Sequence, residues 1–191
     1  KLNSESSLSY AYVNGKRVAR LKGEGYFQVS KDRKHPFVVQ VGNLNIEVLG
    51  TCFNVYSYEE NDFVETSLIE GSVRLYDSKS PSESFILKPS QKAIYSKNNG
   101  KISFHNTDNV KETAWTQNHL VFESEKLGSV FQKIERWYGV HIDLLCPEIA
   151  NDQISGSFKD EQLSYVMEAL KFQYGFNYEI TGNNVTINKS N

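Results

Sequence analysis

The chain has 191 residues, of which 39% are hydrophobic and 23% are charged, and its formal net charge is −2. That length is enough for one large domain or two small ones with hydrophobic cores. The near-neutral charge, without a basic run, argues against a nucleic-acid-binding surface, which needs clustered lysine and arginine. No stretch reaches the ~18 apolar residues of a membrane span. The chain starts at Lys1 rather than Met, so it does not reveal whether the native protein has a signal peptide or an anchor.

Short strands separated by turn residues are predicted from Leu8 to about Phe104. Residues 10–13 and 17–21 flank Asn14-Gly15, which is the strongest short signal for a β-hairpin. Further strands are predicted at residues 25–29, 37–41, 44–48, 52–58, 63–69, 72–76, 85–87, 92–95 and 101–104. This spacing, together with 11 Tyr and 11 Phe, predicts an all-β sandwich or roll over residues 1–110.

A duplicated pattern follows in residues 111–191, and its two copies are 36 positions apart, as Leu127 and Leu163 are. The matching apolar and glycine positions are Leu127, Val130, Ile134, Tyr138, Gly139, Val140, Ile142 and Leu144 in the first copy and Leu163, Val166, Leu170, Tyr174, Gly175, Phe176, Tyr178 and Ile180 in the second. Each copy reads as β-α-β, with Ser124 and Asp160 as expected helix N-caps and Gly139 as a C-cap. We expect the copies to form one small α+β domain, with both helices on one side of a single sheet and a closing strand at 184–188.

The chemistry of an ordinary enzyme is not visible in the chain. Its four histidines are scattered, and it has no phosphate loop, nucleophile elbow or cluster of metal-ligand type, so neither a cofactor nor a metal is expected. Two carboxylates that meet only in space, as in a glycosidase, remain compatible with the sequence. Cys52 and Cys146 lie in different halves beside apolar residues, and we expect unpaired thiols.

Three residues of the duplicated part are candidates for partner binding. Trp137 falls off the main apolar stripe of its predicted helix and is a candidate for a partly exposed anchor. His141 and Asp143 alternate with apolar residues along the next predicted strand, so they should point to solvent. The alternative interpretations are an aromatic side chain in the core and ordinary surface residues.

Several linked motifs resemble the FecR family. They are residues 25–29 (GYFQV), 35–39 (HPFVV), 48–55 (VLGTCFNV), 65–73 (ETSLIEGSV) and 87–93 (LKPSQKA), the last with Ser90 where the family usually has glycine. Trp115, Phe122 and residues 136–140 (RWYGV) and 154–158 (ISGSF) are similar to the C-terminal domain that accompanies FecR in Bacteroidetes-type proteins. The resemblance covers nearly the whole chain.

The resemblance implies an anti-sigma regulator anchored in the inner membrane. A cytoplasmic part would hold an extracytoplasmic-function sigma factor, and the periplasmic part would receive a signal from a TonB-dependent outer-membrane transporter. This chain would be the periplasmic part, without the cytoplasmic segment and membrane helix, and with the first strand of the β domain incomplete. The duplicated domain would resemble the signalling (STN) domains of such transporters, and we expect it to bind one through a sheet edge.

One peptide bond, Gly50-Thr51, needs separate treatment, because some family members are thought to cleave themselves there. The Thr51 hydroxyl would attack the Gly50 carbonyl, and the resulting ester would hydrolyse. Alternatively, Gly50 simply allows a bend between two strands. Three hypotheses therefore remain open, namely a signal-receiving binding module, a carbohydrate-binding β module and a self-cleaving regulator.

Overall fold

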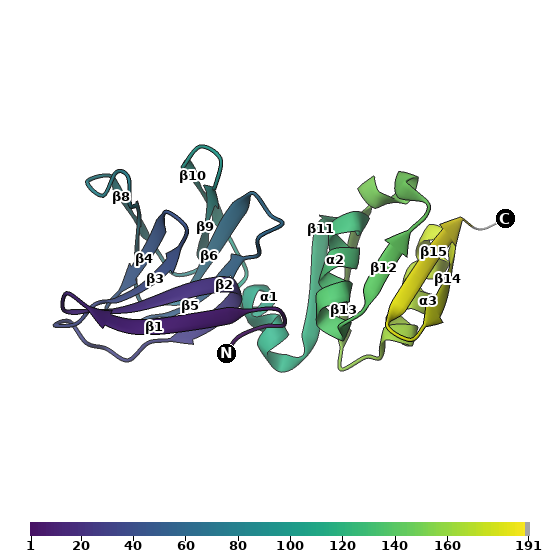
Figure 1. Cartoon of the computed structure of the whole chain (residues 1–191), viewed down its shortest axis with the longest axis horizontal. Helices are drawn as coiled ribbons and strands as arrows, with labels where there is room; N and C mark the ends of the chain where they lie inside the picture. Colours follow the sequence, from purple (N-terminus) through teal and green to yellow (C-terminus); the bar gives the residue numbers. More distant parts are fainter. Residues whose placement is uncertain (190–191) are drawn as a thin grey trace. The chain divides into compact units, whose positions relative to one another are not determined.

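The computed structural model describes residues 1–189 and forms two compact units, Lys1–Thr116 and a second unit that begins at Gln117 (Figure 1). We describe each unit by itself. The first unit extends beyond residue 110 because a short helix, α1 (Asn109–Thr113), packs against it and a 3-10 turn, η1 (Ala114–Gln117), follows. In residues 1–189, no helix is both long and apolar enough to cross a membrane.

The first unit is a single curled sheet with the strand order β10-β9-β6-β5-β2-β3-β4-β7-β8, and β1 pairs with β2 beside this path. Its strands are β1 (Ser7–Val13), β2 (Lys16–Gln28), β3 (Phe37–Val41), β4 (Leu44–Val48), β5 (Cys52–Ser57), β6 (Phe63–Glu70), β7 (Val73–Asp77), β8 (Ser84–Leu87), β9 (Gln91–Ser96) and β10 (Ile102–Asn106). The predicted all-β sandwich or roll is confirmed.

The long strand β2 belongs to both halves of the curled sheet. Its first part pairs with β1 and β3, and its second part pairs with β5 from Gly23 onward. Gly23 has a positive φ of 84°, and a Cβ there would lie 2.3 Å from Ser6 Oγ, so only glycine fits this bend. The sequence predicted two separate strands here, at 17–21 and 25–29, because the glycines on either side of Glu24 look like a break.

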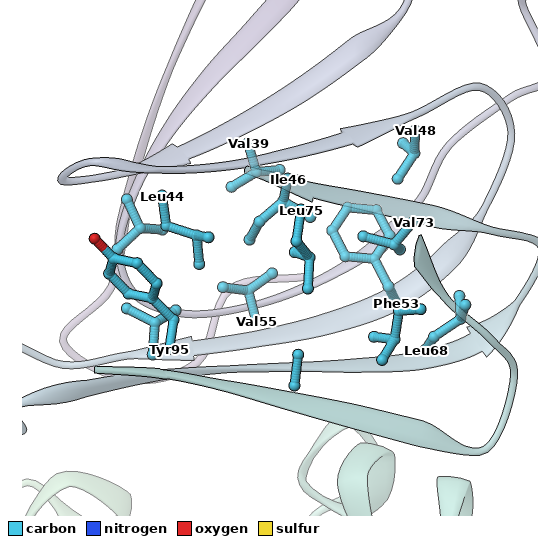
Figure 2. Close-up of a cluster of buried hydrophobic side chains, with 14 of the residues drawn as sticks. Val39, Leu44, Ile46, Val48, Phe53, Val55, Leu68, Val73, Leu75 and Tyr95 are labelled. Carbon is cyan, nitrogen blue, oxygen red and sulfur yellow. The ribbon is translucent and has the colours of Figure 1, made fainter. Parts of the chain in front are cut away.

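The core of the first unit lies between the two halves of the sheet. Figure 2 shows side chains of β3, β4 and β7 pointing toward side chains of β5, β6 and β9. Phe53, Val55, Leu68 and Ile46 are fully buried there. The sheet therefore curls so that the apolar faces of its two halves are buried against each other.

The predicted hairpin at the start of the chain is confirmed. Tyr10 pairs with Ala19 and Val13 with Lys16, and both turn residues, Asn14 and Gly15, have positive φ. That conformation is typical of the two-residue turn whose twist matches antiparallel strands.

The second unit contains two helices of equal length. Its elements are β11 (His119–Lys126), α2 (Leu127–Tyr138), β12 (His141–Leu144), a 3-10 turn η2 (Pro147–Asn151), β13 (Gln153–Lys159), α3 (Leu163–Tyr174), β14 (Phe176–Thr181) and β15 (Asn184–Lys189). Gly139 and Gly175 both end their helices in the left-handed conformation, which confirms the duplicated pattern.

The expected N-caps are wrong. The caps are Lys126 and Gln162, and neither side chain accepts a capping hydrogen bond. Ser124 and Asp160 instead adopt left-handed backbone, with φ of 49° and 53°, at equivalent positions of the two copies. Both types of residue tolerate this conformation in a bend, so a short polar side chain here marks a kink before the helix rather than its cap.

The expected single sheet is also wrong, because the second unit has two. β11 and β13 form one antiparallel pair, and the other sheet has the order β12-β15-β14. The register of the first pair is symmetric under the 36-residue shift, since Leu120 pairs with Phe158 and Phe122 with Gly156. β15 separates β12 from β14 and breaks this symmetry.

The second unit has a hydrophobic core of its own. Leu127, Val130, Ile134, Val166 and Leu170, the apolar stripes of both helices, are buried in it. Cys52 is half-buried in the first unit and Cys146 is buried in the second, and both are free thiols as expected.

Candidate functional site

Gly50 lies between β4 and β5 in a conformation that only glycine adopts readily. Its φ is +153°, and a Cβ there would lie 2.7 Å from Lys31 Cα. The next residue, Thr51, exchanges two backbone hydrogen bonds with Val29, at 3.0 and 3.2 Å. The bend predicted for Gly50 therefore exists, and the backbone on its C-terminal side is tethered to the end of β2.

The Thr51 hydroxyl is buried and has a defined partner. Thr51 is 4% exposed, and its Oγ1 donates a hydrogen bond to the carbonyl oxygen of Ser72 at 3.0 Å. A Cβ added at Gly71, whose φ is +94°, would lie 2.9 Å from both the Gly50 oxygen and Thr51 Oγ1. Close packing thus orients the hydroxyl, and its hydrogen-bond acceptor is a carbonyl oxygen rather than a side-chain base.

Of the three candidate partner-binding residues, the structure brings two together. His141 Nε2 lies 3.2 Å from Asp143 Oδ1, and His141 Nδ1 lies 3.0 Å from Glu135 Oε1. Trp137 is half-buried and packs against the core of the second unit. Within residues 1–189, no three His, Cys, Asp or Glu side chains are grouped to hold a metal ion.

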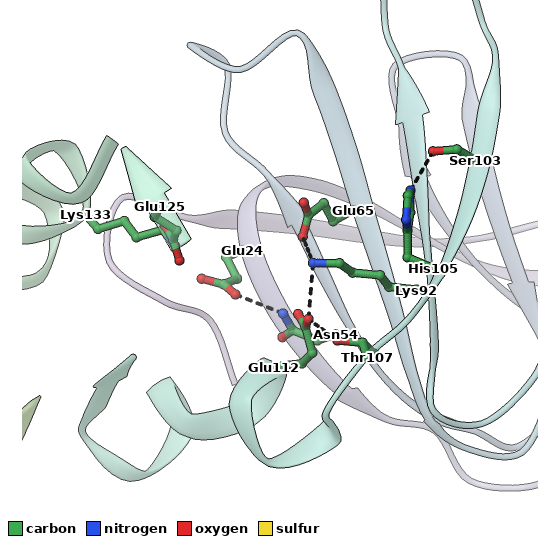
Figure 3. Close-up of polar contacts among 10 residues, drawn as sticks. All are labelled: Glu24, Asn54, Glu65, Lys92, Ser103, His105, Thr107, Glu112, Glu125 and Lys133. Atoms are coloured by element: carbon green, nitrogen blue, oxygen red, sulfur yellow. Dashed lines mark hydrogen bonds and ion pairs between the residues drawn. The ribbon is translucent and has the colours of Figure 1, made fainter. Parts of the chain in front are cut away.

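A polar cluster that the sequence did not reveal lies in the first unit (Figure 3). Lys92 Nζ contacts Glu65 Oε2 at 3.1 Å and Glu112 Oε1 at 3.3 Å, and Thr107 Oγ1 donates a hydrogen bond to Glu112. Burial alone would lower the pKa of Lys92, but the two carboxylates outweigh it and hold the pKa above its ordinary value. Lys92 therefore carries its charge and links α1 to β6 and β9.

A second set of hydrogen bonds holds the segment that follows α1. Trp115 Nε1 donates to Asn54 Oδ1 at 3.2 Å, and Asn54 Nδ2 donates to Glu24 Oε1 at 2.9 Å. Asn3 Nδ2 donates to the other carboxylate oxygen, Glu24 Oε2, at 2.8 Å. We call residues 109–116 the connector. The buried carboxylate of Glu24 and the buried amide of Asn54 thus join the connector to residues 1–3.

The strand pattern explains why this cluster was missed. Asn54 lies between the core residues Phe53 and Val55, so its side chain is on the opposite, outer face of the sheet. Its direct strand partners are Tyr26 and Ser67, and Ser67 in turn pairs with Lys92. In the sequence, these cross-strand neighbours look like the solvent-exposed face of a sheet. Only the packing of the connector against them buries this face.

Comparisons with known proteins agree over the whole chain. The model of the family described as FecR protein matches residues 1–74, and the model described as FecR, C-terminal, matches residues 119–187. A search of curated proteins found no match.

Two crystal structures of a candidate anti-sigma factor from Parabacteroides distasonis ATCC 8503, at 1.65 and 2.50 Å resolution, are similar to this chain. Each has a TM-score of 0.86 and 29% sequence identity, and the similarity covers 100% of this chain and 89% of that one. Since two successive regions match the two family models and the fold matches throughout, the chain belongs to the FecR family of anti-sigma regulators.

Proposed function

We propose that this chain is the periplasmic, signal-receiving part of a membrane-anchored regulator. It binds the N-terminal signalling domain of a TonB-dependent outer-membrane transporter and controls an extracytoplasmic-function sigma factor through a cytoplasmic segment outside this chain. The observation that carries the proposal is the match of both units, in order, to the FecR models. The family assignment supports a regulator that acts by binding rather than by turnover.

The second unit offers a physical means of binding such a domain. β12 and β14 are the two edges of its three-stranded sheet, and an edge strand can pair with a strand of a partner. On β12, His141 and Asp143 are exposed, while Ile142 between them faces the core. A partner strand beside β12 would therefore meet an imidazole and a carboxylate on one face. The likeness of this unit to a transporter signalling domain stays a prediction.

Calorimetry with the purified signalling domains of candidate TonB-dependent transporters tests the proposal. We expect binding, and we expect His141→Ala combined with Asp143→Ala to weaken it by about tenfold, which corresponds to about 1.4 kcal/mol. Glu179→Ala, on the opposite edge strand β14, is the matched control and should bind as the wild type does. Absence of binding to every candidate signalling domain would refute the proposal.

We propose self-cleavage at Gly50-Thr51 as a second activity, supported by the glycine-specific conformation of Gly50 and the oriented hydroxyl of Thr51. Attack of Thr51 Oγ1 on the Gly50 carbonyl carbon would break the C–N bond, and the Thr51 nitrogen would leave as an amine after taking up a proton. Water would then hydrolyse the ester and release residues 1–50 with a new carboxyl terminus.

Intact-mass spectrometry after prolonged incubation distinguishes this activity from a structural role of the bond. Wild type and Thr51→Ser, which keeps the hydroxyl, should yield fragments that end at residue 50 and begin at residue 51. Thr51→Val, which has a similar shape but no hydroxyl, should stay intact. A wild-type protein that keeps its full mass would show that Gly50 and Thr51 serve the fold alone.

A further inference from the structure

Strand β1 has an unpaired edge that runs along its whole length. It pairs with β2 on one side, and the structure places no other described strand against it. All seven of its residues are exposed. Exposed edges are usually protected by charged residues, proline or a bulge, but β1 reads SLSYAYV and carries no charge and no proline. It is therefore an open template for backbone pairing.

The two faces of β1 differ in chemistry. Leu8, Tyr10 and Tyr12 stand on one face, opposite Leu21, Ala19 and Arg17 of β2. Tyr10 and Tyr12 are 60% and 57% exposed, so this apolar row extends past the core without cover. The other face carries small side chains, with Ser9 and Ala11 opposite Arg20 and Val18.

The strand beside this edge carries an unpaired positive charge. Arg20 is exposed and has no carboxylate partner in residues 1–189, whereas its neighbours Lys16 and Lys22 pair with Glu47 and Glu59. The Tyr12 ring lies 5.8 Å from the ring of His35, so the loop before β3 reaches the end of β1.

The loop itself is rich in cations. Its three cations, Lys31, Arg33 and Lys34, also have no carboxylate partner among the described residues, and its Asp32 is held by His35 at 2.8 Å. An added strand would lie about 10 Å from β2, two strand spacings away. The long Arg20 side chain can reach toward it across the small Ser9.

We propose that the free edge of β1 binds an extended segment of a partner protein in which apolar residues alternate with aspartate or glutamate. Backbone hydrogen bonds to β1 supply affinity, the apolar positions cover Leu8, Tyr10 and Tyr12, and the acidic positions face Arg20 across Ser9. A second copy of this chain fits less well, because it would bring the same unpaired cations against each other. This site is on the first unit and goes beyond the transporter binding proposed for the second.

Fluorescence anisotropy with a labelled peptide of about nine residues that alternates valine and glutamate tests the site. We expect saturable binding that weakens with added salt, and no binding of the matched valine-lysine peptide. Tyr10→Lys, which protects the edge, and Arg20→Glu should each weaken binding by about tenfold. Ile86→Lys is the control, because Ile86 is equally exposed, at 58%, on another edge strand, β8.

Circular dichroism and the Tm verify that each variant is folded, which is expected because all three substituted side chains are exposed. Equal binding of the two peptides, or equal loss with Ile86→Lys, would overturn the proposal. So would a Tyr10-dependent dimer in sedimentation, which assigns the edge to a second copy, or Tyr10-dependent binding of a β-glucan oligosaccharide without peptide binding. The peptide is independent of the transporter domain, so failure here leaves the proposed function untouched.

Discussion

Replacing Asn54 by alanine should release the connector from the first unit. Asn54 is 3% exposed, accepts a hydrogen bond from Trp115 Nε1 and donates one to Glu24 Oε1. Its loss leaves the indole N–H and one carboxylate oxygen without this shared partner. No apolar side chain of α1 is buried, so polar contacts, this pair of hydrogen bonds and the Lys92–Glu112 ion pair among them, hold the segment.

The expected cost follows from the two lost hydrogen bonds. A bond to a charged carboxylate contributes about 1.5–3 kcal/mol and a neutral one about 0.5–1.5 kcal/mol, so the free energy of unfolding of the first unit should fall by about 2–4.5 kcal/mol. Asn45→Ala is the matched control. Asn45 is 5% exposed, and its side chain bonds Gln40 and the Asn43 carbonyl at 3.1 and 3.3 Å, all within the β3–β4 hairpin.

Hydrogen exchange measured by mass spectrometry on the peptide 109–117 separates the two variants. Exchange there should accelerate in Asn54→Ala and stay slow in Asn45→Ala, although both lose stability in a urea titration. Trp115 fluorescence, isolated in a Trp137→Phe background, should shift to the red only in the first variant. Unchanged protection of the connector in Asn54→Ala would refute the reasoning that this amide holds it.

Two further variants test the first unit. Burial and the Asp77 carboxylate, which accepts the Tyr95 hydroxyl at 2.6 Å, raise the pKa of Tyr95 to about 12. A raised pKa contributes stability that is complete below the ordinary value of 10 and is lost as the pH rises toward 12, so Tyr95→Phe should flatten the alkaline decline of urea stability. An equally steep decline in both proteins would contradict this. Gly50→Ala should lower the Tm in calorimetry, because its Cβ would meet the Lys31 backbone at 2.7 Å, whereas Gly156→Ala, with nothing within 4 Å, should not. Equal Tm values would remove the argument for a glycine-only position.

The local patterns that predicted the fold correctly are those that neighbouring residues enforce. Asn14-Gly15 can form its turn without help from the rest of the chain, and Gly139 ends its helix through its own left-handed backbone. The 36-residue duplication was visible because both copies bury the same helical stripe. The prediction was correct where residues close together in the sequence determine the local backbone conformation.

The errors arose where distant parts decide. β15 lies between β12 and β14. The duplicated pattern does not specify the position that this last strand takes in the sheet. The connector helix α1 has five residues, too few to stand out by periodicity, and it is held by contacts to Lys92. Glu24 and Asn54 look like solvent-facing strand residues, because the connector that covers them is distant in the sequence.

The symmetric register of β11 and β13 has a consequence for how the second unit arose. Two separate chains, each with one β-α-β copy, could make the same antiparallel pairing about a two-fold axis near Val121 and Ser157. Joining the copies in one polypeptide makes that association independent of concentration. It also frees each copy to diverge, and β15, which has no counterpart in the first copy, makes the two halves distinguishable to any partner.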